Sequence, residues 1–147
     1  MTAQPKNQAT TRHHAPQFKH PDEMAWEMGR FRNATKFLFH PTADDPTTPN
    51  AGFLRYEPGA GFPFHKHDFA QIWYIIEGEF QMGERKYGPG TVVYMADPHF
   101  ENEMRTETGG TVLFVQYPGP TTGGRPIYDG RMNLKVAPPA EEIDLEH

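Results

Sequence analysis

Proline and glycine interrupt this chain at intervals that are too short for long helices. The sequence has 15 Pro and 14 Gly in 147 residues, about a fifth of the chain where roughly 12% is usual. Both residue types break helix interiors. The 11 Phe, 6 Tyr and 2 Trp exclude a wholly disordered chain. We therefore expect an all-β fold with a single core, since this length is thin for two.

Charge and cysteine content restrict the partners and sites that the chain can offer. A net charge of -5 without any basic stripe argues against a nucleic-acid partner. Residues 1–15 are polar, and no apolar run approaches the ~20 residues that span a bilayer. We therefore predict a cytoplasmic protein that binds no membrane. Because the chain has no Cys, disulfides and thiolate zinc sites are excluded, and a metal would need nitrogen and oxygen ligands.

Turn residues divide the chain into three parts. These are a flexible N-terminal segment, residues 1–20, a central domain, residues 21–135, and a C-terminal tail, residues 136–147. The final Leu-Glu-His resembles the remnant of a purification tag, so His147 is left out of any site. Alternating and β-branched segments predict strands at 35–40, 53–57, 71–77, 79–83, 91–95, 99–104 and 111–117. This pattern is typical of an antiparallel sandwich or small barrel.

Two histidines in the stretch GAGFPFHKHDFAQIWYIIEG, residues 59–78, provide the first sign of chemistry. His65 and His67 are two residues apart, and on a strand such side chains point to the same side. Neutral imidazoles in that arrangement can chelate a divalent cation. Paired histidines also occur as ordinary surface residues, so a third ligand is needed. His99, which follows the predicted strand 91–95, is the candidate.

The spacing G-x5-H-x-H-x3-Q-x6-G, residues 59–78, resembles the first motif of the cupin superfamily. The stretch 90–102 resembles the second motif and puts His99 at its histidine position, although Ala-Asp-Pro replaces the usual Pro-x-Gly and the spacing is shorter. The resemblance covers roughly residues 50–117. It implies a single-domain jelly-roll β-barrel with His65, His67 and His99 as internal metal ligands. Because cupins are frequently dimers, it also implies a homodimer.

Gln71 departs from the family, which usually has Glu at this position. An amide keeps a carbonyl oxygen but carries no charge. Three imidazoles and one amide would leave the charge of a divalent ion unneutralised and make it a stronger Lewis acid. We expect Gln71 to be a fourth ligand; the alternative is that it orients an imidazole from behind. The ion itself is expected to be Fe, Zn, Mn or Ni.

The residues around this site indicate a pocket but select no acid or base. Trp73 and Ile75 share parity with Gln71 and should face the same side of the predicted strand. A partly apolar wall of this kind suits a small organic substrate. The candidate acid and base groups are His40, Tyr74, Tyr94 and Asp97, and no spacing distinguishes them.

The resemblance leaves three functions open. Cupins with three histidines and no ligating carboxylate include oxygenases that cleave diketones, aromatic diols or thiol substrates. We therefore favour a non-haem Fe(II) dioxygenase acting on a small oxygenated molecule. A Gln beside three histidines also resembles the site of a cupin-type polyketide cyclase, so a redox-silent cyclase, isomerase or lyase is the alternative. The third possibility is a non-catalytic barrel that binds a small molecule.

Overall fold

The computed structural model describes residues 13–29, 31–124 and 126. The predicted C-terminal tail, residues 136–147, and most of the predicted N-terminal segment, residues 1–20, lie outside the described residues. No helix in the described part is long and apolar enough to cross a membrane. The described elements are η1 (Pro21–Glu23), β1 (Glu27–Met28), β2 (Asn33–Phe39), β3 (Asn50–Tyr56), β4 (Ala60–Phe62), β5 (His65–His67), β6 (Ala70–Gly78), β7 (Phe80–Met82), β8 (Arg85–Tyr87), β9 (Val92–Met95), β10 (His99–Glu101), β11 (Met104–Thr106) and β12 (Gly110–Tyr117).

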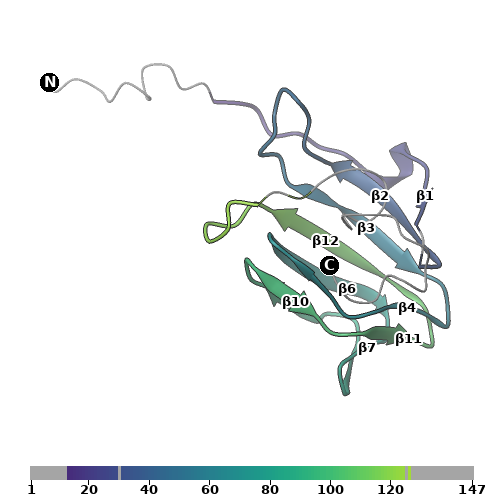
Figure 1. Ribbon diagram of the computed structural model, residues 1–147. Helices are drawn as coiled ribbons and strands as arrows, with labels where there is room; N and C mark the ends of the chain where they lie inside the picture. Colours follow the sequence, from purple (N-terminus) through teal and green to yellow (C-terminus); the bar gives the residue numbers. More distant parts are fainter. Residues whose placement is uncertain (1–12, 30, 125, 127–147) are drawn as a thin grey trace, which may run out of the picture.

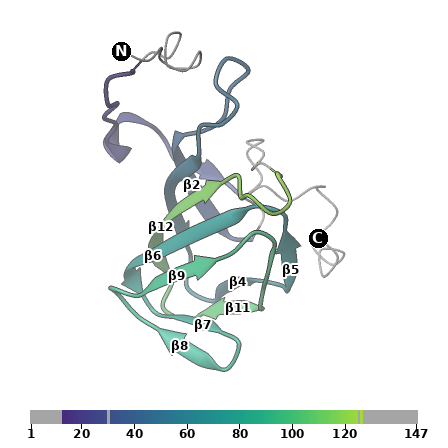
Figure 2. The same ribbon diagram turned by 90° about the vertical axis from the view of Figure 1, so that its left-hand side faces the viewer.

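The strands form an antiparallel jelly roll, as expected from the sequence. One layer is a six-stranded sheet in the order β1-β2-β3-β12-β6-β9 (Figure 1). The other layer contains the four-stranded sheet β4-β11-β7-β8 and the pair β10-β5. Figure 2 shows β9 beside β6, with β4, β11, β7 and β8 in the layer that faces them.

Two pairings of the second layer share one unbroken register. β11 pairs with β4 from Thr106 opposite Ala60 to Met104 opposite Phe62. β10 then pairs with β5, with Glu101 opposite His65. The same register therefore runs across the interruption between the two pairs of strands. The sequence pattern had predicted one strand over 99–104; the structure divides it at residues 102 and 103 into β10 and β11.

The core lies between the two layers and is largely aromatic. On β6 the inward side chains alternate with outward ones, and Trp73 and Ile75 are 2% and 0% exposed. This confirms the parity expected for these two residues. The rings of Trp73 and Phe62 meet edge to face at 6.1 Å, a favourable aromatic geometry. The same ring of Phe62 also meets the His65 ring at 4.8 Å, so the aromatic core borders the buried histidines.

Candidate metal centre

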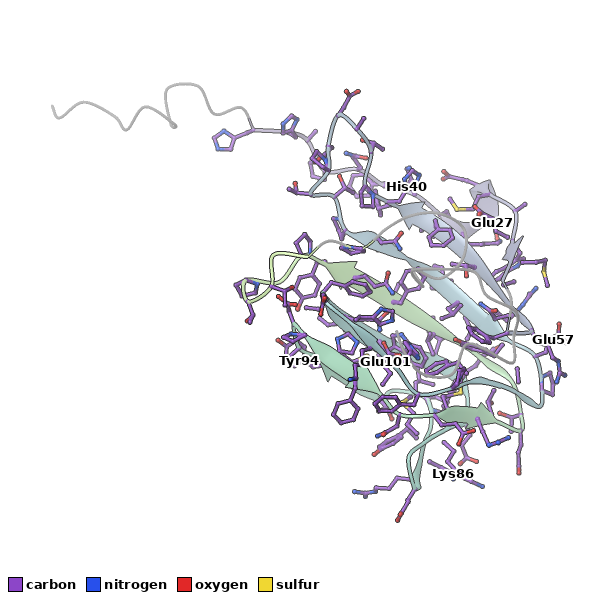
Figure 3. All side chains as sticks on the ribbon, viewed as in Figure 1. Glu27, His40, Glu57, Lys86, Tyr94 and Glu101 are labelled. Carbon is purple, nitrogen blue, oxygen red and sulfur yellow. The ribbon has the colours of Figure 1, made fainter. Side chains whose placement is uncertain are left out.

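Two directly opposed residue pairs on β5 and β10 build the centre. His67 lies opposite His99, and His65 lies opposite Glu101. Residues two apart on a strand share a face, and opposed residues on neighbouring strands share it too. The three-residue strands His-Lys-His and His-Phe-Glu therefore present four potential ligands to the barrel interior. Figure 3 shows Glu101 within the body of the molecule, between the layers.

The three imidazoles converge on one carboxylate. Oε2 of Glu101 lies 3.0 Å from Nε2 of His99 and 3.6 Å from Nε2 of His67. Its Oε1 lies 3.4 Å from Nε2 of His65. The ligand atoms of His65, His67 and Glu101 all lie within 4.8 Å of one another. His99 contacts the same carboxylate but stands outside that set of three.

These separations are close to those expected for ligands of a shared divalent ion. Ligand atoms that lie about 2.1 Å from one ion are roughly 3.0–3.4 Å apart in octahedral or tetrahedral geometry. The three imidazole-to-carboxylate distances span 3.0 to 3.6 Å. Nitrogen and carboxylate oxygen are also the donors that first-row divalent metals accept. His65, His67 and Glu101, with His99 beside them, can therefore hold a metal ion.

Backbone carbonyls fix the direction in which two of the imidazoles point. Nδ1 of His65 lies 2.8 Å from the carbonyl oxygen of Pro63. Nδ1 of His99 lies 2.8 Å from the carbonyl of Ala96 and 3.0 Å from that of Phe69. A carbonyl only accepts, so each Nδ1 carries the proton and the neutral ring offers Nε2 to an ion. The His67 ring is oriented differently, by stacking on Phe69 at 4.5 Å.

Glu101 governs the electrostatics of the centre. Burial alone would lower the pKa of His65 and His99, but the hydrogen bonds and charge of Glu101 outweigh it and raise both pKa values. Burial would likewise raise the pKa of Glu101, but hydrogen bonds from His65 and His99 hold it well below its usual range. The carboxylate is thus ionised in the folded protein and ready to neutralise one charge of a bound cation.

Gln71 contacts this carboxylate through its nitrogen. Its Nε2 donates to Oε2 of Glu101 at 2.8 Å, while its Oε1 accepts from Nε2 of Gln116 at 2.6 Å. Gln116 in turn accepts from Nδ2 of Asn50 at 3.0 Å. Since a carboxylate only accepts, this chain of amides has one self-consistent orientation. In this arrangement the Gln71 oxygen, the atom expected as a ligand, serves Gln116.

Two spaces of very different size meet at Glu101. An inner cavity of about 30 Å³ is lined by His65, His67, Gln71 and Glu101. About 10–15 Å³ is needed for one water, so this cavity suits an ion with one or two waters. A groove of about 610 Å³ runs between β9 and β10, with His99 and Glu101 among its lining residues. Its volume is typical of small-molecule sites.

The four candidate acid and base residues do not enter the centre. Tyr74 and Tyr94 are 42% and 66% exposed. Asp97 is buried but accepts hydrogen bonds from the backbone of Thr121 and Thr122. His40 lies at the end of β2, with Nδ1 3.0 Å from the carbonyl oxygen of its own neighbour, Pro41. Tyr94 does border the groove, as a wall rather than a group facing the imidazoles.

Glu101 is the functional residue that the sequence patterns missed. The signal was present, because His99 and Glu101 repeat the two-residue spacing of His65 and His67. The motif itself points to position 71 for a carboxylate, and that position is an amide here. The first motif thus lacks a carboxylate at position 71. The carboxylate of the centre is that of Glu101 on β10, the strand that pairs with β5.

Comparisons with known proteins agree with this fold. The family model of the ChrR cupin-like domain matches residues 14–121. No curated protein matches the chain significantly.

Solved structures share the fold at low sequence identity. An RmlC-like cupin from Shewanella frigidimarina NCIMB 400 is 18% identical, with a TM-score of 0.57 over 73% of this chain and 95% of its own. KdgF from Halomonas sp. is 20% identical, with a TM-score of 0.56 over 69% and 93%. An acetylacetone dioxygenase from Acinetobacter johnsonii is 10% identical, with a TM-score of 0.59 over 78% and 85%. At such identities the likeness concerns the fold.

Proposed function

The chain belongs to the ChrR cupin-like family, and from this premise we propose that it is a metal-dependent enzyme acting on a small oxygenated molecule. We propose in particular a non-haem Fe(II) dioxygenase. The observation that carries the proposal is the convergence of three imidazoles on the Glu101 carboxylate beside a groove of about 610 Å³. A divalent ion held there supplies Lewis acidity toward oxygen atoms and, if it is ferrous iron, redox chemistry with O2.

The groove is the proposed substrate site. The inner cavity of about 30 Å³ is too small for an organic molecule. The groove walls carry Val93, Met95 and Phe100, and His99 and Glu101 lie along it. Aromatic and thioether side chains favour a flat, partly apolar body. A substrate with two neighbouring oxygen atoms can place its body against these walls and its oxygens toward His99 and Glu101.

The residues of the chain have distinct tasks in this proposal. His65 and His67 hold the ion from the inner side, while their neighbours Phe62 and Phe69 exclude water around the rings. Glu101, which is ionised in the folded protein, would neutralise part of the charge of a bound ion. Gln71 holds that carboxylate in place.

Oxygen consumption by the iron-loaded protein tests the proposal. We expect uptake that depends on substrate across enolisable diketones, catechol-like compounds or flavonols. Glu101→Gln should lower metal affinity about 10–100-fold, whereas the exposed Glu103→Gln, two residues away on the surface, should leave uptake unchanged. Loaded protein that takes up no oxygen with any of these classes would make the dioxygenase proposal wrong.

A redox-silent cyclase, isomerase or lyase is the second candidate, and the carboxylate favours it. Three imidazoles with one carboxylate also suit an ion such as zinc, which only polarises oxygen. This candidate predicts turnover of an enolisable carbonyl compound with zinc or nickel in the absence of oxygen. Turnover that needs both iron and air would exclude it.

A further inference from the structure

The connection between β9 and β10 differs from the second superfamily motif. It reads Ala-Asp-Pro at residues 96–98, where Pro-x-Gly is usual. The side chain of Asp97 in this connection is only 8% exposed. A buried carboxylate needs hydrogen-bond donors, and the donors that Asp97 has in the described contacts come from residues after β12. The departure from the motif therefore has a structural partner elsewhere in the chain.

Residues 118–124, which we call the exit segment, bind both oxygens of the Asp97 carboxylate. The backbone N–H groups of Thr121 and Thr122 donate to Oδ2 at 3.0 and 2.8 Å. The Thr122 hydroxyl donates to Oδ1 at 2.7 Å. The backbone at Gly119 also lies so close to Asp97 that it leaves no room for a Cβ atom. Since hydrogen bonds to an ionised carboxylate are about twice as strong as neutral ones, the exit segment holds this connection firmly.

The Thr122 hydroxyl also reaches the connection that follows β5. Its oxygen lies 3.0 Å from the carbonyl oxygen of Asp68, so its single proton is shared between Asp68 and Asp97. Figure 2 shows the exit segment, in yellow-green, near the end of β5. A Cβ atom at Gly124 would overlap with the Asp68 carbonyl oxygen, so this close approach requires glycine. One hydroxyl thus connects the end of β5 with the residues that lead into β10.

The two residues that bond to this hydroxyl are neighbours of the two that orient His99. The Nδ1 atom of His99 lies 2.8 Å from the carbonyl oxygen of Ala96 and 3.0 Å from that of Phe69. Ala96 directly precedes Asp97, and Phe69 directly follows Asp68. The Ala96 carbonyl belongs to the planar peptide unit that joins it to Asp97. Fixing these two aspartates therefore fixes the carbonyls that determine the direction of the His99 ring.

His67 depends on the same connection after β5. The Phe69 ring stacks on the His67 ring, with centroids 4.5 Å apart. His67 also lies directly opposite His99 in the register of β5 and β10, and the centroids of these two imidazoles are 5.5 Å apart. The residues that follow β5 and precede β10 therefore determine how the two imidazoles face each other.

We propose that Thr122 is a positioning residue of the metal centre, whose hydroxyl fixes His99 relative to His67 by joining the connections beside their strands. The inference rests on the metal ion of the proposed function. His99 stands outside the compact set of His65, His67 and Glu101, so its contribution depends most on its placement. Metal ligands must lie within about 0.2 Å of their ideal distances, and removal of a residue that supports a ligand costs about 10–100-fold in affinity.

Zinc titration of the full chain against a chromophoric chelator tests this role. Thr122→Val keeps the size of the side chain and removes the hydroxyl, and it should weaken zinc binding at least about tenfold. The visible absorption of the Co(II)-loaded protein should change with it, because a displaced imidazole alters the coordination. Thr122→Ser retains the hydroxyl and should restore both properties. Thr121→Val is the matched control, because in the described contacts Thr121 reaches Asp97 only through its backbone.

Gly124→Ala provides a second variant, since it forces the exit segment away from the Asp68 carbonyl and keeps the Thr122 hydroxyl. Zinc binding of wild-type strength in either Thr122→Val or Gly124→Ala would overturn the proposal. Lower resistance to urea with an unchanged Co(II) spectrum would also overturn it, because the hydroxyl would then only close the barrel. So would an equal loss in Thr121→Val, or a serine variant that restores nothing.

The wild type separates this proposal from the proposed function. A wild-type chain that binds no zinc would make the metal centre wrong, and the role of Thr122 with it. A wild-type chain that binds zinc no better than Thr122→Val would make only the role of Thr122 wrong. Neither measurement requires oxygen or a substrate, so both are independent of the reaction that the protein catalyses.

Discussion

Nε2 of Gln71 donates a 2.8 Å hydrogen bond to Oε2 of Glu101. The two residues are buried, at 3% and 8% exposure, and they come from different layers of the barrel. A neutral donor at position 71 and a carboxylate at position 101 are thus complementary: the amide stabilises the charge that the imidazoles attract. The position at which the superfamily usually has Glu supports a carboxylate here instead of supplying one.

Gln71→Glu tests this complementarity. The substitution would replace the amide donor to Glu101 by a second carboxylate, while an oxygen at position 71 could still accept from Nε2 of Gln116. Two buried carboxylates at that distance cannot both stay ionised without a cation. We expect the metal-free protein to lose about 3 kcal/mol of unfolding free energy, with part of the loss restored by zinc. Urea denaturation with and without chelator measures this.

Gln81→Glu is the control for Gln71→Glu, because Gln81 bonds only to the exposed backbone of Gly83 in the described contacts. We expect a change within about 0.5 kcal/mol for this surface variant. If Gln71→Glu were as harmless as Gln81→Glu in the metal-free protein, the amide would not be needed to hold the carboxylate.

Gln116→Leu tests the second link of the amide chain. The variant removes the donor to Gln71 and the acceptor for Asn50, and leaves both amides without these bonds inside the barrel. Each buried polar group that loses its partner costs about 1–3 kcal/mol. We expect a lower unfolding free energy and about tenfold weaker zinc binding, because Gln71 is no longer oriented. Zinc titration against a chromophoric chelator measures the affinity; an unchanged value would restrict Gln116 to a packing role.

The sequence predicted the layers of the fold because its strands carry strong local signals. The strand at 71–77 alternates inward and outward residues, and the structure places β6 at Ala70–Gly78. The short strands were harder to predict from the sequence. The strand Arg85–Tyr87 consists of Arg-Lys-Tyr and has no buried residue, so it carries no periodic pattern. It forms because the tight turn at Gly83 pairs it with β7, which is a matter of turn geometry.

Only the part of the site that lies on a single strand could be predicted from the sequence. The shared face of His65 and His67 follows from the two-residue repeat alone. The role of Glu101 depends on the register between β5 and β10, which sets His65 opposite Glu101. The orientation of Gln71 depends further on Gln116, 45 residues away in the sequence. The spacing of His99 and Glu101 indicates that they share a face, but a single sequence does not state which strand they pair with, so the contact of this carboxylate with His65 could not be predicted.

The pH dependence of the metal-free protein follows from the shifted pKa values. The raised pKa values of His65 and His99 give stability that is complete below about pH 6.5 and is lost as the pH rises through the folded values. The lowered pKa of Glu101 gives stability that is present above about pH 4.3 and is lost as the pH falls. We expect maximal stability between those limits, measured as Tm against pH in chelator.

Zinc should move this optimum upward. An ion requires neutral imidazoles, so protons compete with it until the pH exceeds the raised pKa values of His65 and His99. The stabilisation by zinc should therefore be small at about pH 5 and large at about pH 8. Equal stabilisation at both would mean that zinc binds elsewhere. Glu101→Gln should flatten the acid limb of the metal-free curve.

Gly119→Ala tests how the segment after β12 supports the centre. A Cβ atom at position 119 would lie 2.1 Å from Cβ of Asp97, whose carboxylate accepts from the backbone of Thr121 and Thr122 at 3.0 and 2.8 Å. Asp97 follows Ala96, whose carbonyl orients the His99 ring. We expect a loss of about 1–3 kcal/mol in unfolding free energy and about tenfold weaker zinc binding.

Gly88→Ala is the matched control, because a Cβ atom there meets no atom within 4 Å. Its stability and zinc affinity should stay close to those of the wild type, within about 0.5 kcal/mol. The comparison separates two explanations. If Gly119→Ala loses stability but binds zinc normally, the segment only closes the barrel. If both fall together while Gly88→Ala is unaffected, the contact between residue 119 and Asp97 also positions His99 in the centre.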